Sequence, residues 1–496
     1  MKLSPVVFIG LDSADPALLL KWEQEGLLPS LGALRRRSLR GRVILPPGLG
    51  TGAMWVSLYS GVSPAKHGRY FGRQIEDDAY RVVPFRQDAV KQAPVWVAAS
   101  QARKRVAVID IPVAPLAEEL TGIQIKDWGA HDPVFPGVRT CPPSLAEEVT
   151  ARFGSDPAGN CDRPRKNFTE FRDRLIERVD KKAQHACHYL QQGGWDLFMA
   201  AFGDSHCVAH QAWHLHDPSH PLHDPEFAKA HGDPVKDVYI ALDRAVGRIL
   251  QCVSPETTFM LFSGSGMGPN YTGNHLLDDA LRRLEGLPVT PSRTAVQAVK
   301  QVYRKVLPDL VRSWLGPLGD RVEEMSLASE RGGRLCYAIP HNDLSGAVRF
   351  NVVGREPSGR VKRGEEYDAL CSSLRRDLMA LRNPDTGTAV VTDVLKTSDL
   401  YVGPYLDQLP DVLVVWNRER PITAIASEKI GEIRGVRMSK RTGDHTPNGV
   451  FFACGPGTAP GELADPVPVE NFAPTIAALL GVALPDVDGS TILPSA

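Results

Sequence analysis

The sequence lacks any apolar run of about 18 residues, the length that a membrane-spanning helix requires. Its first apolar stretch covers only about six residues before Asp12, which is too short for the core of a signal peptide. We therefore expect a cytoplasmic protein that has no membrane partner.

Clustered cysteines and a large net charge are also missing. The eight Cys residues are scattered and form no Cys-x-x-Cys pair, a pattern typical of reduced thiols in a long chain. The 57 Lys and Arg residues nearly balance the 58 Asp and Glu residues, giving a net charge of −1. Because no global field would attract a nucleic acid polymer or an anionic membrane, neither is an expected partner, and a homodimer is left open.

Several common catalytic motifs are absent. The sequence Gly48-Leu49-Gly50-Thr51-Gly52 is not a Gly-x-Gly-x-x-Gly fingerprint, and it lacks the Lys of a P-loop. The sequence Ser263-Gly264-Ser265-Gly266-Met267 has Ser where a nucleophile elbow needs its first Gly. A sulfatase Cys-x-Pro-x-Arg motif does not occur, since Cys141-Pro142-Pro143 does not fit it. These absences disfavour a dinucleotide-binding protein, a P-loop protein, a serine hydrolase and a sulfatase.

Strand and helix patterns alternate over the first 260 residues. Short apolar runs rich in Val and Ile are separated by helical stretches such as 168–190. This alternation predicts an α/β fold with a doubly wound, mostly parallel sheet flanked by helices. Residues 280–345 are basic and helix-rich, so we predict a first core part over 1–279, a helical insertion or lid over 280–345, and a C-terminal core part over 346–496.

Two polar side chains in the first 60 residues are candidates for chemistry. Asp12 directly follows the apolar run Val6–Leu11, where it could cap a helix or bind a metal at the carboxyl end of a strand. Thr51 lies in a Gly-rich loop before a helix predicted over 53–60, where backbone N–H groups would favour an anion. A threonine hydroxyl is a weak nucleophile, so Thr51 would need a base or a metal.

Histidine is concentrated in one segment, with seven of the fourteen His residues between His206 and His231. Asp204 follows a predicted buried strand, and His206 and His210 have the i, i+4 spacing that lets two side chains grip one metal. Asp204 and His210 are interpreted as metal ligands. The later members His214, His216, His220 and His223 are interpreted as loop residues without a metal.

A third ligand is expected near the C-terminus. His445 lies in the turn Thr442-Gly443-Asp444-His445, just before a predicted buried strand. A histidine at a strand end beside an acid is a good candidate for the same metal as Asp204 and His210.

Together these segments resemble the alkaline phosphatase superfamily, in particular its type I phosphodiesterase/nucleotide pyrophosphatase branch. The resemblance covers roughly residues 5–275 and 385–490. The family-like residues of its most specific stretch are Thr51, Ser57, Ser60-Gly61 and Pro64-Ala65-Lys66-His67-Gly68. The C-terminal match consists of Val469-Glu470-Asn471-Phe472-Ala473-Pro474-Thr475, Gly481 and Asp488-Gly489.

The resemblance implies an alkaline phosphatase-like core and a metal-dependent phosphoric ester hydrolase of the phosphodiesterase type. Thr51 would be the nucleophile, and a small phosphorylated molecule the substrate. Zinc is the expected metal, with manganese as the second candidate. One metal would be bound by Asp204, His210 and His445, with His206 as a further candidate ligand; the other would be bound by Asp12 and Thr51.

The sequence departs from the family pattern after its fourth predicted strand. The family carries Ser-Asp-His-Gly there, and the Asp and His bind the second metal. This chain has Gly264 and Ser265 in their place. We therefore expect one full metal site and one altered site. The alternative is a diverged, weakly active or non-catalytic relative that binds a phosphorylated ligand or a partner.

Overall fold

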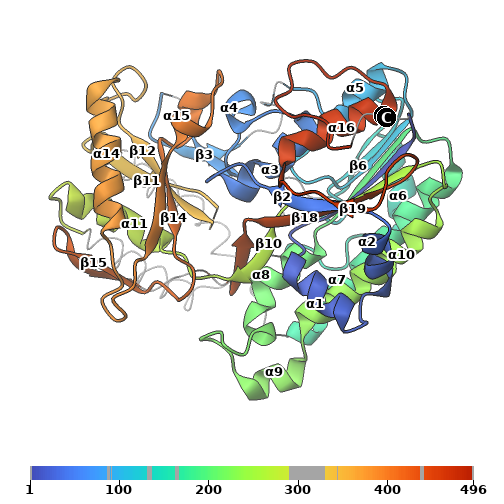
Figure 1. Cartoon of the computed structure of the whole chain (residues 1–496), viewed down its shortest axis with the longest axis horizontal. Helices are drawn as coiled ribbons and strands as arrows, with labels where there is room; N and C mark the ends of the chain where they lie inside the picture. The colour runs from blue at the N-terminus through green and yellow to red at the C-terminus, as the bar shows by residue number, and fades with distance from the viewer. Residues whose placement is uncertain are drawn as a thin grey trace. The chain divides into compact units, whose positions relative to one another are not determined.

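A computed structural model describes most of the chain, and Figure 1 shows its elements. The described residues are 3–76, 78–85, 90, 92–130, 137–161, 167–289, 330–342, 344–435, 439 and 441–493. The chain forms two compact units. The first unit consists of Met1–His67, Arg86–Asn270 and Ser439–Ala496, and the second of Gly68–Phe85 and Tyr271–Met438.

This division differs from the three-part organisation predicted from the sequence. The boundaries fall at Asn270 and Ser439 instead of 279 and 346, so most of the predicted C-terminal core part belongs to the second unit. The reason is that the four strands β11, β12, β13 and β14, which lie between Cys336 and Trp416, pair with one another in a separate antiparallel sheet. Of the predicted insertion 280–345, residues 290–329 lie outside the described residues.

The first unit is built on a ten-stranded sheet. Its strands are β1 (Val6–Leu11), β2 (Leu39–Ile44), β5 (Val106–Ile109), β6 (Gly122–Lys126), β7 (Arg139–Cys141), β8 (Leu197–Phe202), β9 (Thr258–Ser263), β18 (Asn448–Cys454), β19 (Gly461–Glu462) and β20 (Val467–Pro468). Their spatial order is β19-β2-β18-β9-β1-β8-β5-β6-β7, with β20 beside β2.

Most strand pairs in this sheet are parallel. Strand β1 lies in the middle and pairs in parallel with both β8 and β9, so the chain winds outward from β1 in two directions. Strand β18 is antiparallel to both of its neighbours, β9 and β2. The predicted α/β fold with a mostly parallel sheet flanked by helices is therefore confirmed.

Helices cover both faces of the sheet. They are α1 (Pro16–Gln24), α2 (Pro29–Arg36), α3 (Gly50–Ser60), α4 (Pro64–His67), α5 (Val95–Gln101), α6 (Leu145–Phe153), α7 (Phe168–Gln192), α8 (Asp204–His216), α9 (Pro225–His231), α10 (Pro234–Gln251) and α16 (Phe472–Leu480), with a short 3-10 turn η3 (Val469–Asn471). Figure 1 shows α3, α5 and α16 on one side of the sheet and α1, α2, α7 and α10 on the other.

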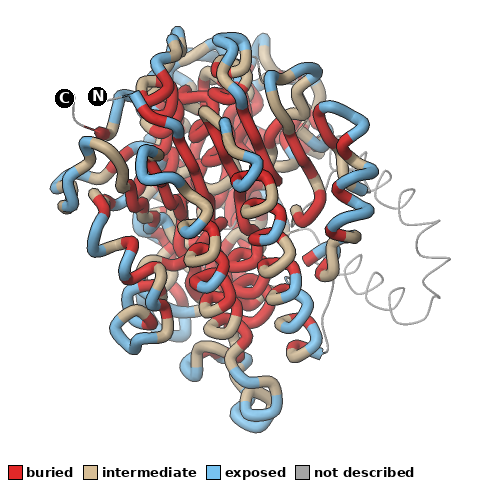
Figure 2. The backbone as a smooth tube through the Cα atoms, turned by 90° about the vertical axis from the view of Figure 1, so that its right-hand side faces the viewer, coloured by how far each residue is buried: buried red, intermediate tan, exposed pale blue. Residues whose placement is uncertain are grey.

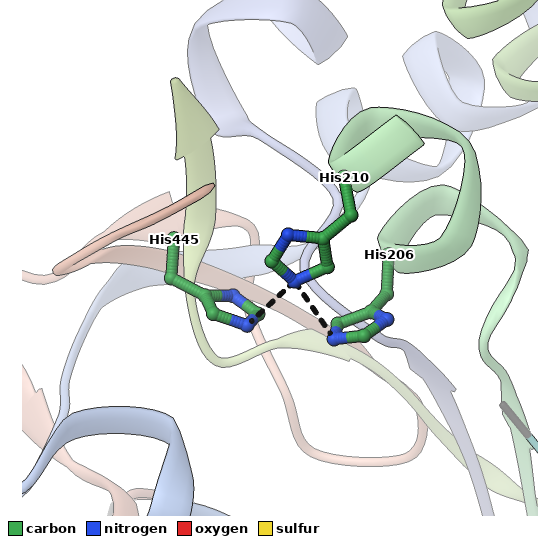
Figure 3. A group of neighbouring side chains, drawn as sticks. All are labelled: His206, His210 and His445. Atoms are coloured by element: carbon green, nitrogen blue, oxygen red, sulfur yellow. Dashed lines mark hydrogen bonds between the residues drawn. The ribbon is translucent and has the colours of Figure 1, made fainter. Parts of the chain in front are cut away.

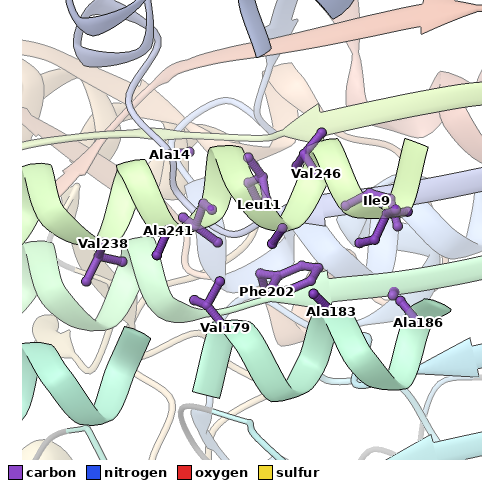
Figure 4. Packing of buried hydrophobic residues seen from close by; sticks show 14 of the residues in the cluster. Ile9, Leu11, Ala14, Val179, Ala183, Ala186, Phe202, Val238, Ala241 and Val246 are labelled. Carbon is purple, nitrogen blue, oxygen red and sulfur yellow. The ribbon is translucent and has the colours of Figure 1, made fainter. Parts of the chain in front are cut away.

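Successive side chains of β1 point to opposite faces of the sheet, so each face packs against its own layer of helices. Ile9 and Leu11 point to one face and join the core made with α7 and α10, which Figure 4 shows from close by. Phe8 points to the other face, where its ring meets that of Phe472 of α16 at 6.2 Å. Because both faces are covered, β1, β8 and β9 are buried along their whole length, as the red tube in Figure 2 shows.

The second unit has a four-stranded antiparallel sheet in the order β11-β12-β14-β13. Two further pairs, β3-β4 and β15-β16, form two-stranded sheets. The strands of the whole unit are β3 (Arg73–Ile75), β4 (Val82–Pro84), β11 (Cys336–Ile339), β12 (Ser345–Phe350), β13 (Val391–Lys396), β14 (Val412–Trp416), β15 (Ala424–Ser427) and β16 (Gly431–Arg434). Its helices are α11 (Asn274–Leu284), α14 (Glu365–Met379) and α15 (Thr397–Leu400), with a 3-10 turn η2 (Leu406–Gln408). Its core is separate and includes Leu277, Val348 and Val414.

The structure bears on the predicted state of the cysteines and on the predicted absence of a membrane-spanning segment. Cys161 and Cys207 form a disulfide, with their Cα atoms 5.5 Å apart, so the prediction of eight reduced thiols is wrong for this pair. The spacing in sequence hid the pair, because folding joins residues 46 positions apart. Among the described helices, none has the length and apolar character to span a bilayer. The cytoplasmic location stays a prediction.

Candidate active site

The predicted site residues come from one edge of the large sheet. Strands β1, β8 and β9 run in parallel and end at this edge, where Asp12, Asp204 and Ser263–Ser265 lie. Strand β2 also ends there, because it is antiparallel to β18, which is antiparallel to β9. The loop to Thr51 leaves this edge, and His445 arrives at it just before β18. The carboxyl edge of a parallel sheet is where α/β proteins place their sites.

Three buried histidines meet at this edge. His206 and His210 come from α8, and His445 comes from β17 (Gly443–Thr446), which pairs with β10 (Gly266–Pro269). His210 Nε2 lies 3.1 Å from His206 Nε2 and 3.2 Å from His445 Nε2. Figure 3 shows the three rings directed toward one another. Within the described part of the chain, this is the one group of His, Cys, Asp or Glu side chains placed to hold a metal.

The spacing of the three rings is compatible with a shared divalent metal. Two ligand nitrogens on a tetrahedral metal with bonds of about 2.0–2.1 Å lie about 3.3 Å apart, close to the two spacings from His210 Nε2, and all three ligand atoms lie within 4.8 Å of one another. His210 Nδ1 lies 2.8 Å from the Gly443 carbonyl, to which it must donate its proton. The lone pair of His210 is then on Nε2, the atom that faces the other two rings. Three imidazole ligands suit zinc, and other divalent metals accept the same ligands.

Asp204 is not part of this group, although the sequence favoured it as a ligand. It is the first residue of α8, and a turn of about 100° per residue directs it almost opposite to His206. There it accepts a hydrogen bond of 2.7 Å from Arg178 Nε of α7, in an ion pair whose two side chains are fully buried. The structure thus brings together His206, His210 and His445, and it assigns Asp204 to the contact between α7 and α8.

The disulfide lies beside this ion pair. Arg178 Nη2 contacts the sulfur atoms of Cys207 at 3.2 Å and Cys161 at 3.5 Å. Cys207 is the residue after His206, so the disulfide ties the helix that carries two of the three histidines. Arg178 Nη1 also reaches Asp156 at 3.4 Å.

Asp12 belongs to a hydrogen-bond network on the other side of His445. Ser13 Oγ donates to Asp12 Oδ1 at 3.2 Å and lies 3.1 Å from His445 Nδ1. Ser265 Oγ in turn contacts Ser13 Oγ at 3.0 Å. Ser13 has a φ of 58°, an uncommon conformation for a residue other than glycine, and such backbone strain concentrates at functional sites. The network holds the Nδ1 side of His445, so its Nε2 faces His210.

Thr51 lies in the first turn of α3, which begins at Gly50, three residues before the predicted helix start. Gly48 before the helix and Gly50 at its first position have φ of 70° and 53°, so the chain turns sharply into the helix. Thr51 is half-buried, and the backbone N–H groups of the first turn make this end of α3 favourable for an anion.

The other residues of the Thr51 stretch hold α3 in place. Ser57 is fully buried, and its hydroxyl lies 3.0 Å from His67 Nε2. The C-terminal segment clamps the turn after α3, since the amide of Asp488 donates to the Gly61 carbonyl at 2.8 Å. Burial, with a smaller contribution from Asp488, raises the pKa of Glu470 to about 7, while a hydrogen bond with Ser57 opposes the rise.

The later histidines of the segment contact other parts of the protein, and the prediction that all four lie in a loop is wrong for two of them. His214 and His216 extend the last turn of α8 instead of lying in a loop. His214 Nδ1 contacts Thr442 Oγ1 at 3.1 Å, and burial lowers the pKa of His214 to about 4. His216 Nδ1 lies 2.8 Å from the Asp233 carboxylate.

Comparison with known proteins assigns this arrangement to a family. The family model described as "Type I phosphodiesterase / nucleotide pyrophosphatase" matches residues 6–429. The chain belongs to this family. It is therefore a member of a family of phosphoric ester hydrolases. No sequence among the curated proteins matches the chain.

Solved structures support the fold of this family member. A variant of the alkaline phosphatase PafA is 12% identical, with a TM-score of 0.52 and coverage of 99% of this chain and 98% of that chain. Phosphonoacetate hydrolase from Sinorhizobium meliloti 1021, in complex with phosphonoacetate, is 13% identical, with a TM-score of 0.51 and coverage of 97% and 96%. At these identities the likeness establishes the shared fold.

The surroundings of Gly264 and Ser265, where this chain departs from the family pattern, are closely packed. A Cβ atom placed on Gly264 would overlap Met54 Sδ and lie 2.7 Å from Phe262 Cζ. The space for a longer side chain at Gly264 is therefore filled by Met54 of α3. Ser265 uses its hydroxyl within the network around His445, so neither position offers a vacant metal site.

Sequence reasoning gave too little weight to His206 and did not single out Arg441. The i, i+4 spacing of His206 and His210 was the available sign for His206. Arg441 Nη1 lies 3.5 Å from His210 Nε2, a proximity that nothing in the local sequence indicates.

Proposed function

We propose that the protein hydrolyses phosphate esters of a small molecule, with Thr51 as nucleophile and one divalent metal held by His206, His210 and His445. The observation that carries this proposal is the convergence of the three Nε2 atoms at the sheet edge from which the Thr51 loop leaves. Zinc fits the three imidazoles best, and manganese is the second candidate.

The chain's own residues account for binding and attack. The N-terminal turn of α3 favours the phosphate anion through its backbone N–H groups. The Thr51 hydroxyl gives its proton to solvent, and its oxygen forms a bond to phosphorus while the bond to the leaving alkoxide breaks; the alkoxide takes a proton from solvent. Water then adds to phosphorus and breaks the bond to the Thr51 oxygen, which regains a proton as phosphate is released. A bound divalent metal would supply Lewis acidity, which lowers the cost of the charge that develops on phosphoryl oxygens. The Asp12–Ser13–His445 network keeps His445 in a fixed orientation.

A second candidate function is supported by the altered region. Gly264 and Ser265 stand where the resemblance implies an Asp and a His that bind a second metal, and Met54 fills the space at Gly264. A relative with one metal could bind a phosphorylated ligand with weak turnover or none.

Replacement of Thr51 by Ala tests the proposal, with Thr51→Ser as the matched control. We expect Thr51→Ala to lower turnover of an aryl phosphodiester and an aryl monoester by at least ~10³-fold, while its metal content stays that of the wild type. Thr51→Ser keeps a hydroxyl and should retain much of the activity. Unchanged turnover in Thr51→Ala would exclude Thr51 as nucleophile. A wild-type protein that binds phosphate and metal but turns over neither ester would favour the second candidate.

A further inference from the structure

Arg441 places a positive charge at the three-histidine site. Its Nη1 lies 3.5 Å from His210 Nε2, and the side chain is half-buried. The backbone at this position is tied to its surroundings: Asn270 Nδ2 donates to the Arg441 carbonyl at 3.2 Å. The next amide, Thr442 N, donates to the His210 carbonyl of α8 at 2.8 Å. These hydrogen bonds fix the backbone of Arg441 and Thr442 against α8, the helix that carries His210.

The lone pair of His210 can serve the guanidinium or a metal, but not both. His210 donates its Nδ1 proton to the Gly443 carbonyl, so Nε2 is its one acceptor atom. When a metal takes this lone pair, His210 no longer accepts from Arg441, and the guanidinium lies beside a dication. A guanidinium stays charged at all physiological pH values, so the two positive charges repel each other. An anion that contacts both charges removes this repulsion.

We propose that Arg441 is an anion-binding residue of this site, which takes an oxygen of the substrate's phosphoryl group when the metal is bound. This inference rests on the proposed function for the identity of the anion. Arg441 then supplies the phosphoryl group with a second positive charge in a chain that has lost the ligands of a second metal. Its planar donors match the geometry of phosphate oxygens. Arg441 also couples the two ligands, because the anion tightens metal binding and the metal tightens anion binding to the same extent.

A role limited to packing makes the opposite prediction. If the guanidinium only donates to the His210 ring, its removal weakens metal binding or leaves it unchanged, and phosphate has no special effect. If Arg441 binds the anion, its removal relieves the repulsion of the metal and abolishes the effect of phosphate.

The test measures the zinc dissociation constant by chelator competition, with and without inorganic phosphate, on the full chain. We expect phosphate to tighten zinc binding to the wild type by ~10-fold, within the usual range for coupled sites. Arg441→Gln should bind zinc at least as tightly as the wild type without phosphate, and phosphate should change its constant less than ~2-fold. Arg40→Gln, which removes an exposed arginine paired with Glu462, is the matched control and should behave as the wild type.

Arg441→Lys keeps the inference testable if Arg441→Gln does not fold. Lysine keeps the charge without the planar donors, so the effect of phosphate should fall several-fold but not disappear. Equal coupling in the wild type and in either Arg441 variant would overturn the inference, as would a wild type without coupling.

The outcome separates this inference from the proposed function. Coupling that depends on Arg441, in a protein that turns over no phosphate ester, supports the anion-binding role and rejects the hydrolase. Turnover that depends on Thr51, with no coupling between phosphate and zinc, supports the hydrolase and rejects the role of Arg441.

Discussion

Two groups of side chains at the same edge of the sheet differ in what they kept of the family pattern. The histidine group consists of His206, His210 and His445, and its nitrogen atoms converge. The serine group consists of Asp12, Ser13 and Ser265, whose oxygen atoms are joined by hydrogen bonds. His445 belongs to both, since Ser13 contacts its Nδ1 and His210 faces its Nε2. The comparison teaches that the serine group fixes the orientation of His445, a member of the histidine group.

The largest expected effect separates the ligands from their neighbours on α8. Replacement of His206 by Ala should lower zinc affinity by more than ~100-fold, since loss of a direct ligand exceeds the effect of removing an outer partner. His214→Ala on the same helix removes a histidine outside the group and should leave zinc affinity within about threefold. Zinc content after dialysis against a chelator measures both. Wild-type zinc affinity in His206→Ala would exclude His206 as a metal ligand.

Replacement of Asp204 tests whether this acid binds the metal or only forms the ion pair with Arg178. Asp204→Asn leaves Arg178 buried without its main counter-charge, so we expect a loss of about 3 kcal/mol of unfolding free energy. Zinc stoichiometry should stay the same. Urea unfolding and metal analysis give the two quantities. The control Asp156→Asn removes the longer contact of Arg178 and should cost less. Loss of bound zinc in a folded Asp204→Asn protein would return Asp204 to the ligand set.

Restoring the family residues on the serine side should fail while Met54 is present. Gly264→Asp with Ser265→His should cost about 1–3 kcal/mol of stability, because the new side chain at Gly264 overlaps Met54. Zinc stoichiometry should not rise until Met54→Ala makes room. The control Gly72→Ala meets only Arg69 Nη2 at 3.9 Å and should be well tolerated. Two bound metals in the protein that still carries Met54 would show that this region remained a metal site.

Glu470 gives the smallest effect and probes the support of α3. A carboxyl whose folded-state pKa is raised to about 7 binds its proton more tightly in the folded protein. Its contribution to stability is therefore complete below about pH 4.5 and is lost as the pH rises through 7, by about 2 kcal/mol after allowance for partial exposure. Glu470→Gln should flatten the fall in stability between pH 5 and 8, whereas the exposed control Glu462→Gln should not. Urea unfolding across this pH range measures the slopes, and an unchanged slope in Glu470→Gln would contradict the assignment.

Much of the fold could be predicted because it depends on local patterns. The apolar run at Val6–Leu11 became β1, and the stripe of 168–190 became α7. The Asp15-Pro16 start of α1 was also predictable, since the Asp15 carboxylate accepts from the amides of Ala17 and Leu18. The segments 348–350, 389–395 and 411–416 were predicted as strands of the C-terminal core part, but they pair in the separate antiparallel sheet of the second unit, and Cys336–Ile339 was not predicted as a strand.

The candidate site was predictable in position and only partly in composition. Thr51 and His210 come after strands β2 and β8, whose carboxyl ends lie at one edge, and His445 precedes β18, an antiparallel strand that starts at the same edge. Asp204 was weighted above His206 because the family pattern pairs an Asp with a His. The helical period of α8 would have shown that these two residues face opposite sides.

What the sequence by itself determined was the order of strands and helices and the presence of a threonine at a helix start with histidines at strand ends. Backbone geometry sets these features over a few residues, so they can be read from neighbours in the chain. The tertiary structure decided that Asp204 pairs with Arg178, that Met54 fills the space at Gly264, and that Arg441 reaches His210. Each of these contacts joins side chains from segments distant in sequence, and their packing cannot be derived from the local pattern of either segment.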